Sequence, residues 1–312
     1  MASAAPQVTS RVGDWVRLHA RNTPDRVFVT DERRYTFAEV NSRVNRIAGE
    51  LARRGVTRGE RVALFATDST AYVEVVLACM KLGAVYVPLN YRLTRPEVGT
   101  LLRAAEASVL FFAERYTDLV DGLDVPTLRE VICIDGGRHP DTVERILAVG
   151  VDEEIDAVVH DDDLAALAFT SGTTGLPKGV MHSPRMVKFM AYQSVMDRRL
   201  HAPFFHYSPS PLFHVAGLCF VLGGVSRGWP SLILPAFDPA TVLAWMQRGE
   251  LTDVFLVPTM IDMLLDRPGV RDVGYPGLRS IAYGAAPMSP ELLRRAMAVF
   301  DCDFLNVFGA GT

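Results

Sequence analysis

Apolar and polar residues follow two different periods along this chain, and the two periods alternate. In residues 39–55 the apolar positions recur every three or four residues, as they do on one face of a helix. These positions are Val40, Val44, Ile47, Ala48 and Leu51. Gly55 predicts the end of this helix, because glycine readily takes the left-handed conformation that closes helices. Short, uniformly apolar runs come between such helical segments, and they predict strands that are buried on both faces.

The same pattern predicts an α/β fold for the rest of the chain. The predicted strands are 61–66, 84–89, 108–112, 164–169, 231–235, 252–257, 279–284 and 303–308. The predicted helices are 71–83, 95–107, 239–249, 259–267 and 289–300. Strands that alternate with helices favour mostly parallel sheets with helices on both faces. The alternation is densest in two blocks, so we expect subdomains at roughly 12–135 and 165–312, joined by the polar connection 136–163.

Composition narrows the class of protein. The 312 residues are 49% hydrophobic and 22% charged, and the net charge is -4. That balance offers no basic surface for a nucleic acid. The four cysteines are scattered without a CxxC spacing, which disfavours a zinc site or a disulfide scaffold and suits a reducing compartment. With no signal-like start and no long uncharged apolar run, the chain is expected to be cytoplasmic and without a membrane span.

The stretch "TSGTTGLPKG" (170–179) concentrates hydrogen-bond donors directly after the predicted strand 164–169. It contains three glycines, four hydroxyl residues, one proline and one lysine. Ligands of open α/β sheets bind beyond the carboxyl ends of the strands. Glycines let backbone N–H groups converge on an anion, and the hydroxyl groups and Lys178 add further donors. The stretch therefore predicts a polyphosphate site, with a flexible surface loop as the alternative.

This loop differs from the P-loop of kinases and GTPases. There the lysine is followed by Ser or Thr at the start of a helix. Here Lys178 stands between Pro177 and Gly179, and the following "KGVMHS" reads as extended. We therefore expect the loop to join two extended segments and to hold phosphate without a helix N-terminus.

The wider stretch "LAFTSGTTGLPKGVMHS" (167–183) resembles the phosphate-binding signature of the adenylate-forming superfamily. This superfamily comprises acyl-CoA synthetases, the adenylation domains of peptide synthetases and beetle luciferases. Further stretches follow in the family's order, namely 55–98, "PLFHVAGL" (211–218), "VPTMIDMLL" (257–265) and "YGAAPMS" (283–289). The resemblance implies that the chain is a large N-terminal, AMP-binding domain with two stacked, mostly parallel sheet layers flanked by helices.

The resemblance also implies an activity. Members join a carboxylic acid to ATP, forming acyl-AMP and pyrophosphate, and a thiol, usually that of coenzyme A, then displaces AMP. In such chemistry, positioning and charge neutralisation supply most of the catalysis. The implied cofactors and substrates are therefore ATP, Mg²⁺, coenzyme A and a carboxylic acid.

By the same resemblance, individual residues acquire expected roles. The expected catalytic residues are Lys178, Thr170 and His214, and Thr170 is also the candidate magnesium contact. The expected nucleotide contacts are Thr170, Ser171, Gly172, Thr173, Thr174, Gly175, Lys178, Gly284, Ala285, Ala286 and Pro287. The expected acyl-pocket residues are His214, Val215, Gly217, Val257, Met260 and Gly284. The alternatives are a plain strand-to-helix turn for 284–287 and a structural histidine for His214 and for His182.

The acid substrate is expected to be apolar or aromatic. Amino-acid-activating relatives carry an acidic residue near the position of His214, which pairs with the substrate amine. The local sequence here is "SPSPLFHVAGL" (208–218), which has no carboxylate. A charged amine would then be buried without a partner, at a high cost in free energy.

The end of the chain departs from the family pattern. The family continues with an aromatic-Gly-x-Thr-Glu stretch, whereas this chain reads "NVFGAGT" (306–312). The expected magnesium-binding glutamate, the ribose-binding aspartate, the hinge and the small C-terminal domain with its lysine do not follow. We therefore expect a truncated N-terminal portion that is inactive or impaired alone.

Three matters stay open at this level. The chain could be a non-catalytic nucleotide-binding protein, or an aryl-acid adenylation domain that loads a carrier protein instead of coenzyme A. A homodimer is also left open, as are the identity and length of the acyl group.

Overall fold

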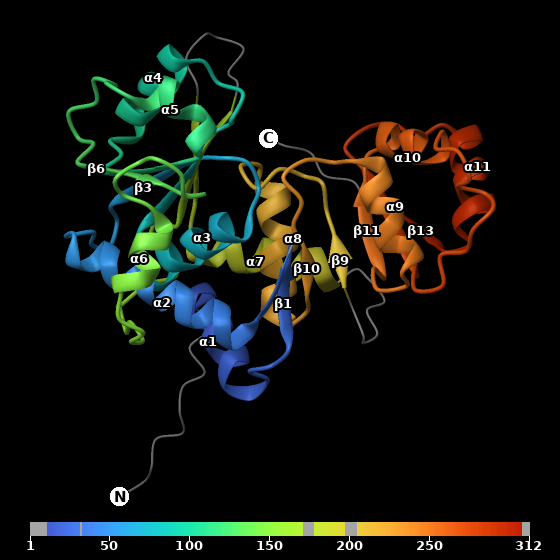
Figure 1. Ribbon diagram of the computed structural model, residues 1–312, viewed down its shortest axis with the longest axis horizontal. Coiled ribbons are helices and arrows are strands. Elements are labelled where there is room, and N and C mark those ends of the chain that lie inside the picture. Colours follow the sequence, from blue (N-terminus) through green and yellow to red (C-terminus); the bar gives the residue numbers. More distant parts are fainter. Residues whose placement is uncertain (1–10, 32, 171–177, 197–204, 308–312) are drawn as a thin grey trace, which may run out of the picture.

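The computed structural model describes residues 11–31, 33–170, 178–196 and 205–307, which form two mostly parallel β-sheets with helices between and around them (Figure 1). The six-stranded sheet has the order β6-β5-β3-β4-β7-β8. Its strands are β3 (Arg61–Phe65), β4 (Val85–Pro88), β5 (Val109–Phe112), β6 (Glu130–Cys133), β7 (Ala166–Thr170) and β8 (Lys178–His182). All neighbouring pairs are parallel except β7 with β8.

The seven-stranded sheet has the order β13-β12-β11-β9-β10-β1-β2. Its strands are β1 (Val27–Thr30), β2 (Arg34–Thr36), β9 (His206–Tyr207), β10 (Ser231–Leu232), β11 (Asp253–Leu256), β12 (Ser280–Gly284) and β13 (Asp303–Val307). Only β1 and β2 pair in the antiparallel sense. The expectation of two mostly parallel sheets is therefore confirmed.

Helices separate and cover the sheets. They are α1 (Val12–Asn22), α2 (Phe37–Arg53), α3 (Thr70–Leu82), α4 (Arg95–Ala105), α5 (Thr117–Val120), α6 (Val143–Val149), α7 (Pro184–Met196), α8 (Val215–Arg227), α9 (Pro239–Gln247), α10 (Pro258–Leu265) and α11 (Pro290–Phe300), with a 3₁₀ turn at Glu114–Tyr116. In Figure 1, α3, α7 and α8 occupy the middle of the molecule, while α9, α10 and α11 lie together beside β11. One continuous apolar core accordingly joins residues of α3, α7 and α8 to both β1 and β3.

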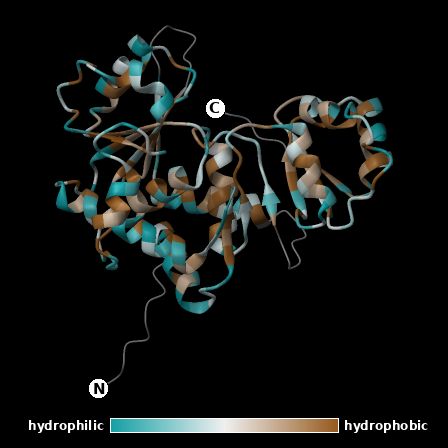
Figure 2. Ribbon diagram, viewed as in Figure 1, coloured by the Kyte–Doolittle hydropathy of each residue, from teal (hydrophilic) through white to brown (hydrophobic). Residues whose placement is uncertain are grey.

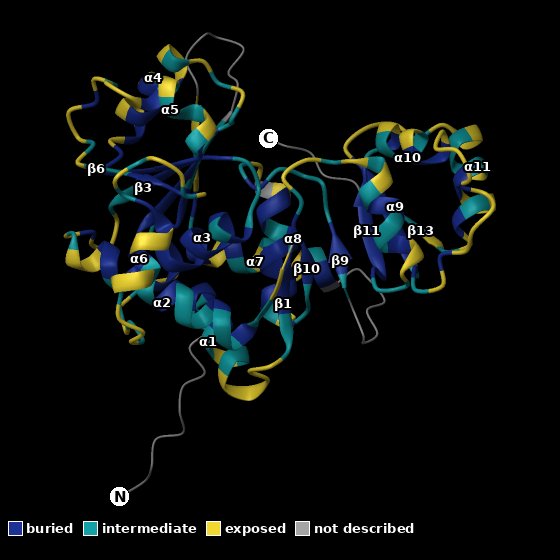
Figure 3. Cartoon of the chain, in the orientation of Figure 1, coloured by how far each residue is buried: buried dark blue, intermediate teal, exposed yellow. Residues whose placement is uncertain are grey.

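The alternation of side chains along β3 shows why its run is apolar throughout. Val62 and Leu64 pack into the central core, whereas Ala63 and Phe65 face the outer helices α4 and α5. Each strand residue points to the face opposite its neighbour, so a sheet covered on both sides needs apolar residues at every position. Strands β4, β5 and β11 are accordingly buried throughout, and β11 is dark in the burial view (Figure 3). The helices carry both hydrophobic and hydrophilic colours (Figure 2).

Local signals fix the ends of several helices. The Ser69 and Ser289 hydroxyls accept hydrogen bonds from Tyr72 N and Leu292 N, which caps α3 and α11. Gly83 follows α3 directly with a φ angle of 72°, and Gly55 lies two residues beyond α2 with a φ angle of 80°. These helix ends match the sequence prediction.

The expected subdomains 12–135 and 165–312 do not coincide with the two sheets. Strands β1 and β2 come from the first block but pair into the seven-stranded sheet through β10. Strands β7 and β8 come from the second block but extend the six-stranded sheet through β4. These pairings join residues far apart in the sequence, where hydrophobic periodicity gives no indication of the partner. The subdomain boundaries therefore remain a prediction.

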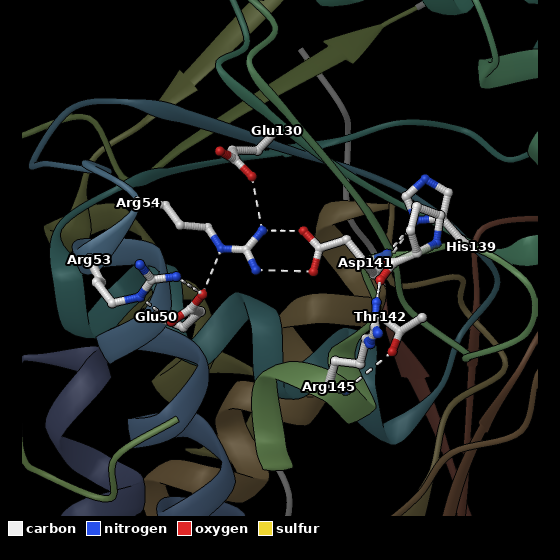
Figure 4. Close-up of polar contacts among 9 residues, drawn as sticks. Glu50, Arg53, Arg54, Glu130, His139, Asp141, Thr142 and Arg145 are labelled. Atoms are coloured by element: carbon white, nitrogen blue, oxygen red, sulfur yellow. Dashed lines mark hydrogen bonds and ion pairs between the residues drawn. The ribbon is translucent and has the colours of Figure 1, made fainter. Parts of the chain in front are cut away.

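The polar connection 136–163 is tied firmly to the six-stranded half. At its start, the Arg54 guanidinium, which follows α2, donates to both carboxylate oxygens of Asp141 and to Glu130 Oε2 at 2.9 Å (Figure 4). Glu50 Oε1 accepts a further bond from Arg54 Nε at 2.8 Å. The short helix α6 lies within this connection, for which the sequence analysis predicted no helix.

Candidate active site

The candidate phosphate loop lies at the open end of a β-hairpin. Strands β7 and β8 pair in the antiparallel sense, with Thr170 opposite Lys178 as the last pair. This confirms the expectation that the loop joins two extended segments. Residues 171–177, which include the expected contacts Ser171, Gly172, Thr173, Thr174 and Gly175, lie outside the described residues. Lys178 is exposed at the start of β8.

The other expected site segments share one edge of the seven-stranded sheet. Strands β12, β11 and β9 are parallel neighbours, so the segments that follow them emerge side by side. These segments are 284–287 after β12, 257–260 after β11 and 208–214 after β9. Ligands of α/β sheets bind at such carboxyl edges. The topology thus gathers stretches that are well separated in the sequence.

The segment 284–287 is shaped by close backbone approach. A Cβ atom on Gly284 would lie 2.2 Å from the carbonyl oxygen of Val307 on β13, so only glycine fits there. Ala285 has a φ of 63°, an uncommon conformation for a residue with a side chain. Ala285, Ala286 and Pro287 are exposed. The small side chains leave this backbone open to a flat ligand.

Val257 and Met260 pack into different apolar clusters. Val257, at the N-cap of α10, contacts a cluster formed by Phe220, Phe255 and Ala282. The Phe220 and Phe255 rings lie 5.0 Å apart between centroids and link α8 to β11. Met260 packs instead with the core beneath α9, α10 and α11. The two residues thus flank the start of α10 on different sides.

His214 is the N-cap residue of α8, and its side chain is exposed. Its pKa is lowered by partial loss of hydration and by the positive charge of Arg92. The neutral imidazole is therefore favoured near pH 7. Of the other expected residues nearby, Val215 opens α8. Gly217 is buried, and a Cβ there would lie 2.3 Å from the Ser210 carbonyl oxygen.

The loop 208–214 also reaches the carboxyl edge of the six-stranded sheet. Phe213 packs edge-on against Tyr91, which follows β4, with 5.3 Å between ring centroids. Leu212 N donates to Asp68 Oδ1 at 2.9 Å, and Asp68 follows β3. The β7 end, at Thr170, lies on the same edge of that sheet because β3, β4 and β7 are parallel neighbours. The loop carrying His214 therefore bridges the two sheet edges.

Asp68 is the polar group that sequence analysis missed. Burial raises its pKa to about 7, although the hydrogen bond from Leu212 N opposes this shift. A carboxyl group with such a pKa exists in both protonation states at neutral pH. No motif marks Asp68, because its importance comes from a contact with Leu212 that only the folded chain creates.

His182, on β8, is buried and pairs with Ala166 of β7. Its Nδ1 has no hydrogen-bond partner in the described part of the chain, and burial lowers the pKa of the ring. The histidine lies in the hairpin itself, four residues beyond Lys178, which fits the structural role considered above.

Among the described residues, no three His, Cys, Asp or Glu side chains are grouped so that they could hold a metal ion. The expected magnesium contact of Thr170 therefore remains a prediction. Of the described helices, none combines the length and apolarity that crossing a bilayer requires.

Comparison with known proteins shows the family to which this chain belongs. The family described as AMP-binding enzyme matches residues 16–311. The chain is 30% identical over 307 residues to a fatty acid–[acyl-carrier-protein] ligase, ScoC, of Streptomyces coeruleorubidus, covering 94% of this chain and 56% of the relative. It is 33% identical over 286 residues to a feruloyl-CoA synthase of an Amycolatopsis species, covering 91% and 56%.

A solved structure agrees with these relatives. The inhibitor-bound N-terminal domain of FACL13 from Mycobacterium tuberculosis superposes with a TM-score of 0.88 at 26% identity, covering 96% of this chain and 76% of that one. The fold of two mostly parallel sheets is thus shared with the N-terminal domain of an acyl-CoA synthetase. The chain is a member of the AMP-binding enzyme family, whose relatives here are acyl ligases. It spans a little over half the length of these curated relatives.

Proposed function

We propose that this chain performs the adenylation step of an ATP-dependent acid–thiol ligase. A carboxylate oxygen of the acid attacks the α-phosphorus of ATP, a new O–P bond forms, and pyrophosphate leaves with the electrons of the broken P–O bond. The thiol of coenzyme A then attacks the acyl carbon and releases AMP. The observation that carries the proposal concerns the carboxyl edge of the six-stranded sheet. The β7–β8 hairpin opens at this edge, and the loop 208–214 contacts the same edge.

The chain's residues divide the work as follows. Lys178 and the loop before it hold the β- and γ-phosphates and neutralise their charge. The backbone of 284–287 packs against the adenine ring, since its small side chains leave that surface open. His214 lies beside the acid carboxylate, and its favoured neutral state lets it donate one hydrogen bond without forming a tight ion pair.

The acid is proposed to be apolar or aromatic. The rings of Phe220 and Phe255, together with Val257, form an apolar cluster next to the edge where the three loops emerge. The described residues of the loop 208–214 carry no carboxylate to pair with a substrate amine. The names of the relatives, a fatty acid ligase and a feruloyl-CoA synthase, fit this class of acid.

A second acceptor is also supported. ScoC is named as a ligase that acts on an acyl carrier protein, so the thiol that receives the acyl group could be that of a carrier protein. Both acceptors present a phosphopantetheine-type thiol, and the adenylation step is the same for both.

The test is ATP binding followed by pyrophosphate exchange with the purified chain. Calorimetry should detect ATP binding, and labelled pyrophosphate should enter ATP in the presence of fatty or aryl acids. Thioester formation over many turnovers is expected to be absent or slow. Absence of ATP binding would reject the proposal, and exchange driven by amino acids alone would reject the proposed acid class.

A further inference from the structure

Leu212 lies two residues before His214, and side chains bind both of its backbone polar groups. Its N–H donates to Asp68 Oδ1 at 2.9 Å, and its carbonyl oxygen accepts from the Tyr86 hydroxyl at 3.0 Å. Its own side chain is buried. Both backbone polar groups of this loop residue are thus hydrogen-bonded to side chains.

The direction of these hydrogen bonds is fixed by chemistry. A carbonyl oxygen can only accept, so the Tyr86 hydroxyl must donate its proton to Leu212. The Tyr86 oxygen then accepts from the Tyr72 hydroxyl, 2.6 Å away. Tyr72, Tyr86 and Leu212 are all buried, so water cannot replace these bonds. Loss of one member would leave a buried polar group unpaired.

The two anchoring side chains belong to the six-stranded sheet, while the loop belongs to the seven-stranded one. Asp68 follows β3, and Tyr86 lies in β4. Tyr86 is also paired in register with Ala166 of β7, the strand that leads to the candidate phosphate loop. The same residue therefore pairs with strand β7 through its backbone and holds the loop that carries His214 through its hydroxyl.

The start of α8 reinforces this arrangement. A Cβ on Gly217 would clash with the carbonyl oxygens of Ser210 and Pro211, so the first turn of α8 packs directly on the loop. His214 lies between Leu212 and that turn. Its position is consequently determined from both sides.

We propose that Asp68 and Tyr86 are positioning residues that fix His214 relative to the β7–β8 hairpin, so that the acid carboxylate meets the α-phosphate of ATP in line. This inference rests on the proposed function. Neither residue touches the reacting atoms, and both act through Leu212.

The test uses single-residue variants of the whole chain and two separate measurements. Tyr86→Phe removes the hydroxyl that holds the Leu212 carbonyl, and Asp68→Ala removes the acceptor for the Leu212 N–H. Asp68→Asn keeps an oxygen acceptor and serves as the rescue variant. Tyr207→Phe is the matched control, because the buried Tyr207 hydroxyl has no hydrogen-bond partner among the residues that the structure describes.

The first measurement is calorimetric affinity for AMP and for two acyl-sulfamoyl adenosines, hexanoyl and benzoyl. Tyr86→Phe and Asp68→Ala should weaken an acyl analogue at least tenfold while AMP affinity changes less than twofold. Asp68→Asn and Tyr207→Phe should stay within threefold of the original chain. Equal losses for AMP and the acyl analogues, or none, would overturn the inference.

The second measurement needs no ligand. The imidazole resonances of His214 in ¹H–¹³C NMR spectra should shift or broaden in Tyr86→Phe and Asp68→Ala but not in the control. Unchanged His214 resonances in both variants would overturn the inference even if the chain binds ATP. If the original chain binds neither AMP nor the analogues, the proposed function fails, and the NMR result alone decides whether His214 is positioned as described.

Discussion

Lys81 Nζ lies 2.8 Å from Glu154 Oε2, and this contact joins helix α3 to the connection between the two halves of the chain. The Lys81 side chain is 1% exposed and the Glu154 side chain 23%. Lys81 Nζ also donates to Asn41 Oδ1 at 2.8 Å. Burial lowers the pKa of Lys81, and Glu154 opposes that shift. The buried Lys81 ammonium therefore holds the connection to α3, and the Glu154 carboxylate balances its charge.

Glu154→Ala should destabilise the chain by about 2 kcal/mol in urea unfolding, between the values typical of buried and of exposed pairs. The reason is that the Lys81 ammonium stays buried without its counter-charge. Burial acts to raise the pKa of Glu154, but hydrogen bonds from Asn41 and Lys81 outweigh it and leave the pKa lowered. The stabilisation that ionised Glu154 provides is therefore present above the pKa that Glu154 has in the unfolded chain. It disappears as pH falls through the pKa that Glu154 has in the folded chain.

The control is Arg294→Ala, which breaks an exposed pair with Glu291 on α11. It should cost less than about 0.5 kcal/mol, as exposed ion pairs do. Similar losses for both variants would contradict the role assigned to the Lys81–Glu154 contact.

Lys178→Ala should weaken ATP binding about tenfold and AMP binding less than twofold. Lys178 lies opposite Thr170 at the open end of the hairpin, where a cation can reach the terminal phosphates. A charge-assisted hydrogen bond contributes about 1.5–3 kcal/mol, and the exposed position puts this one at the lower end. Calorimetry with both nucleotides measures the difference.

Arg185→Ala is the matched control, because it removes an exposed cation just beyond the other end of β8. Its ATP affinity should match that of the original chain. If both variants lose ATP and AMP equally, the hairpin does not hold the outer phosphates.

Gly284→Ala should destabilise the chain by about 2–3 kcal/mol, as overpacking does. The new Cβ would meet the Val307 carbonyl oxygen on the adjacent strand, and neither backbone can move alone. Gly274→Ala should be neutral or slightly stabilising, since no atom of the described residues lies within 4 Å of a Cβ there. Urea midpoints that fall equally in the two variants would refute the close approach of β12 and β13.

Stability should depend on pH through Asp68. Burial raises the pKa of its carboxyl group to about 7, against about 3.9 in an unfolded chain. The folded state therefore binds the Asp68 proton more tightly than the unfolded state does. The free energy of unfolding should fall as pH rises from about 4 through about 7, because the folded chain then has to give up that proton.

Asp68→Asn cannot ionise, so its stability relative to the original chain should increase between pH 5 and pH 8. The expected gain is about 1–2 kcal/mol, because one pKa unit corresponds to about 1.4 kcal/mol and solvent screens part of the effect. Urea unfolding at the two pH values measures it. A difference that stays constant with pH would show that Asp68 has an ordinary pKa.

The sequence predicted the elements whose signals are local. Helices α3 and α11 follow from periodic apolar residues and from caps such as Ser69 and Ser289, and the structure confirms them. The stretch that forms α8, "VAGLCFVLGGVSR", was not predicted as a helix, and only its residues Val215 and Gly217 were assigned a role, in the acyl pocket. Its helical period is hidden since the helix packs between two sheets.

The candidate site, too, has a part that the sequence predicts and a part that it does not. The hairpin around 170–178 was predicted because glycine, hydroxyl and lysine residues are adjacent in the sequence. The anchoring of Leu212 by Asp68 and Tyr86 could not be predicted, because it joins residues from three separate stretches. The strand predicted at 231–235 is only Ser231–Leu232, since its pairing depends on β1 and β9 rather than on its own composition.

The pairing of β1 with β10 has a consequence for how the chain is synthesised. Val29 of β1 pairs in register with Ser231 of β10, so β1 emerges from the ribosome long before its partner strand. Until then, the apolar side chains of Phe28 and Val29 and the open strand edge must be shielded by local collapse or by a chaperone. Because this pairing joins residues that are far apart in the sequence, it predicts slow folding. The pairing of β1 with β10 is then expected to be the last step of folding.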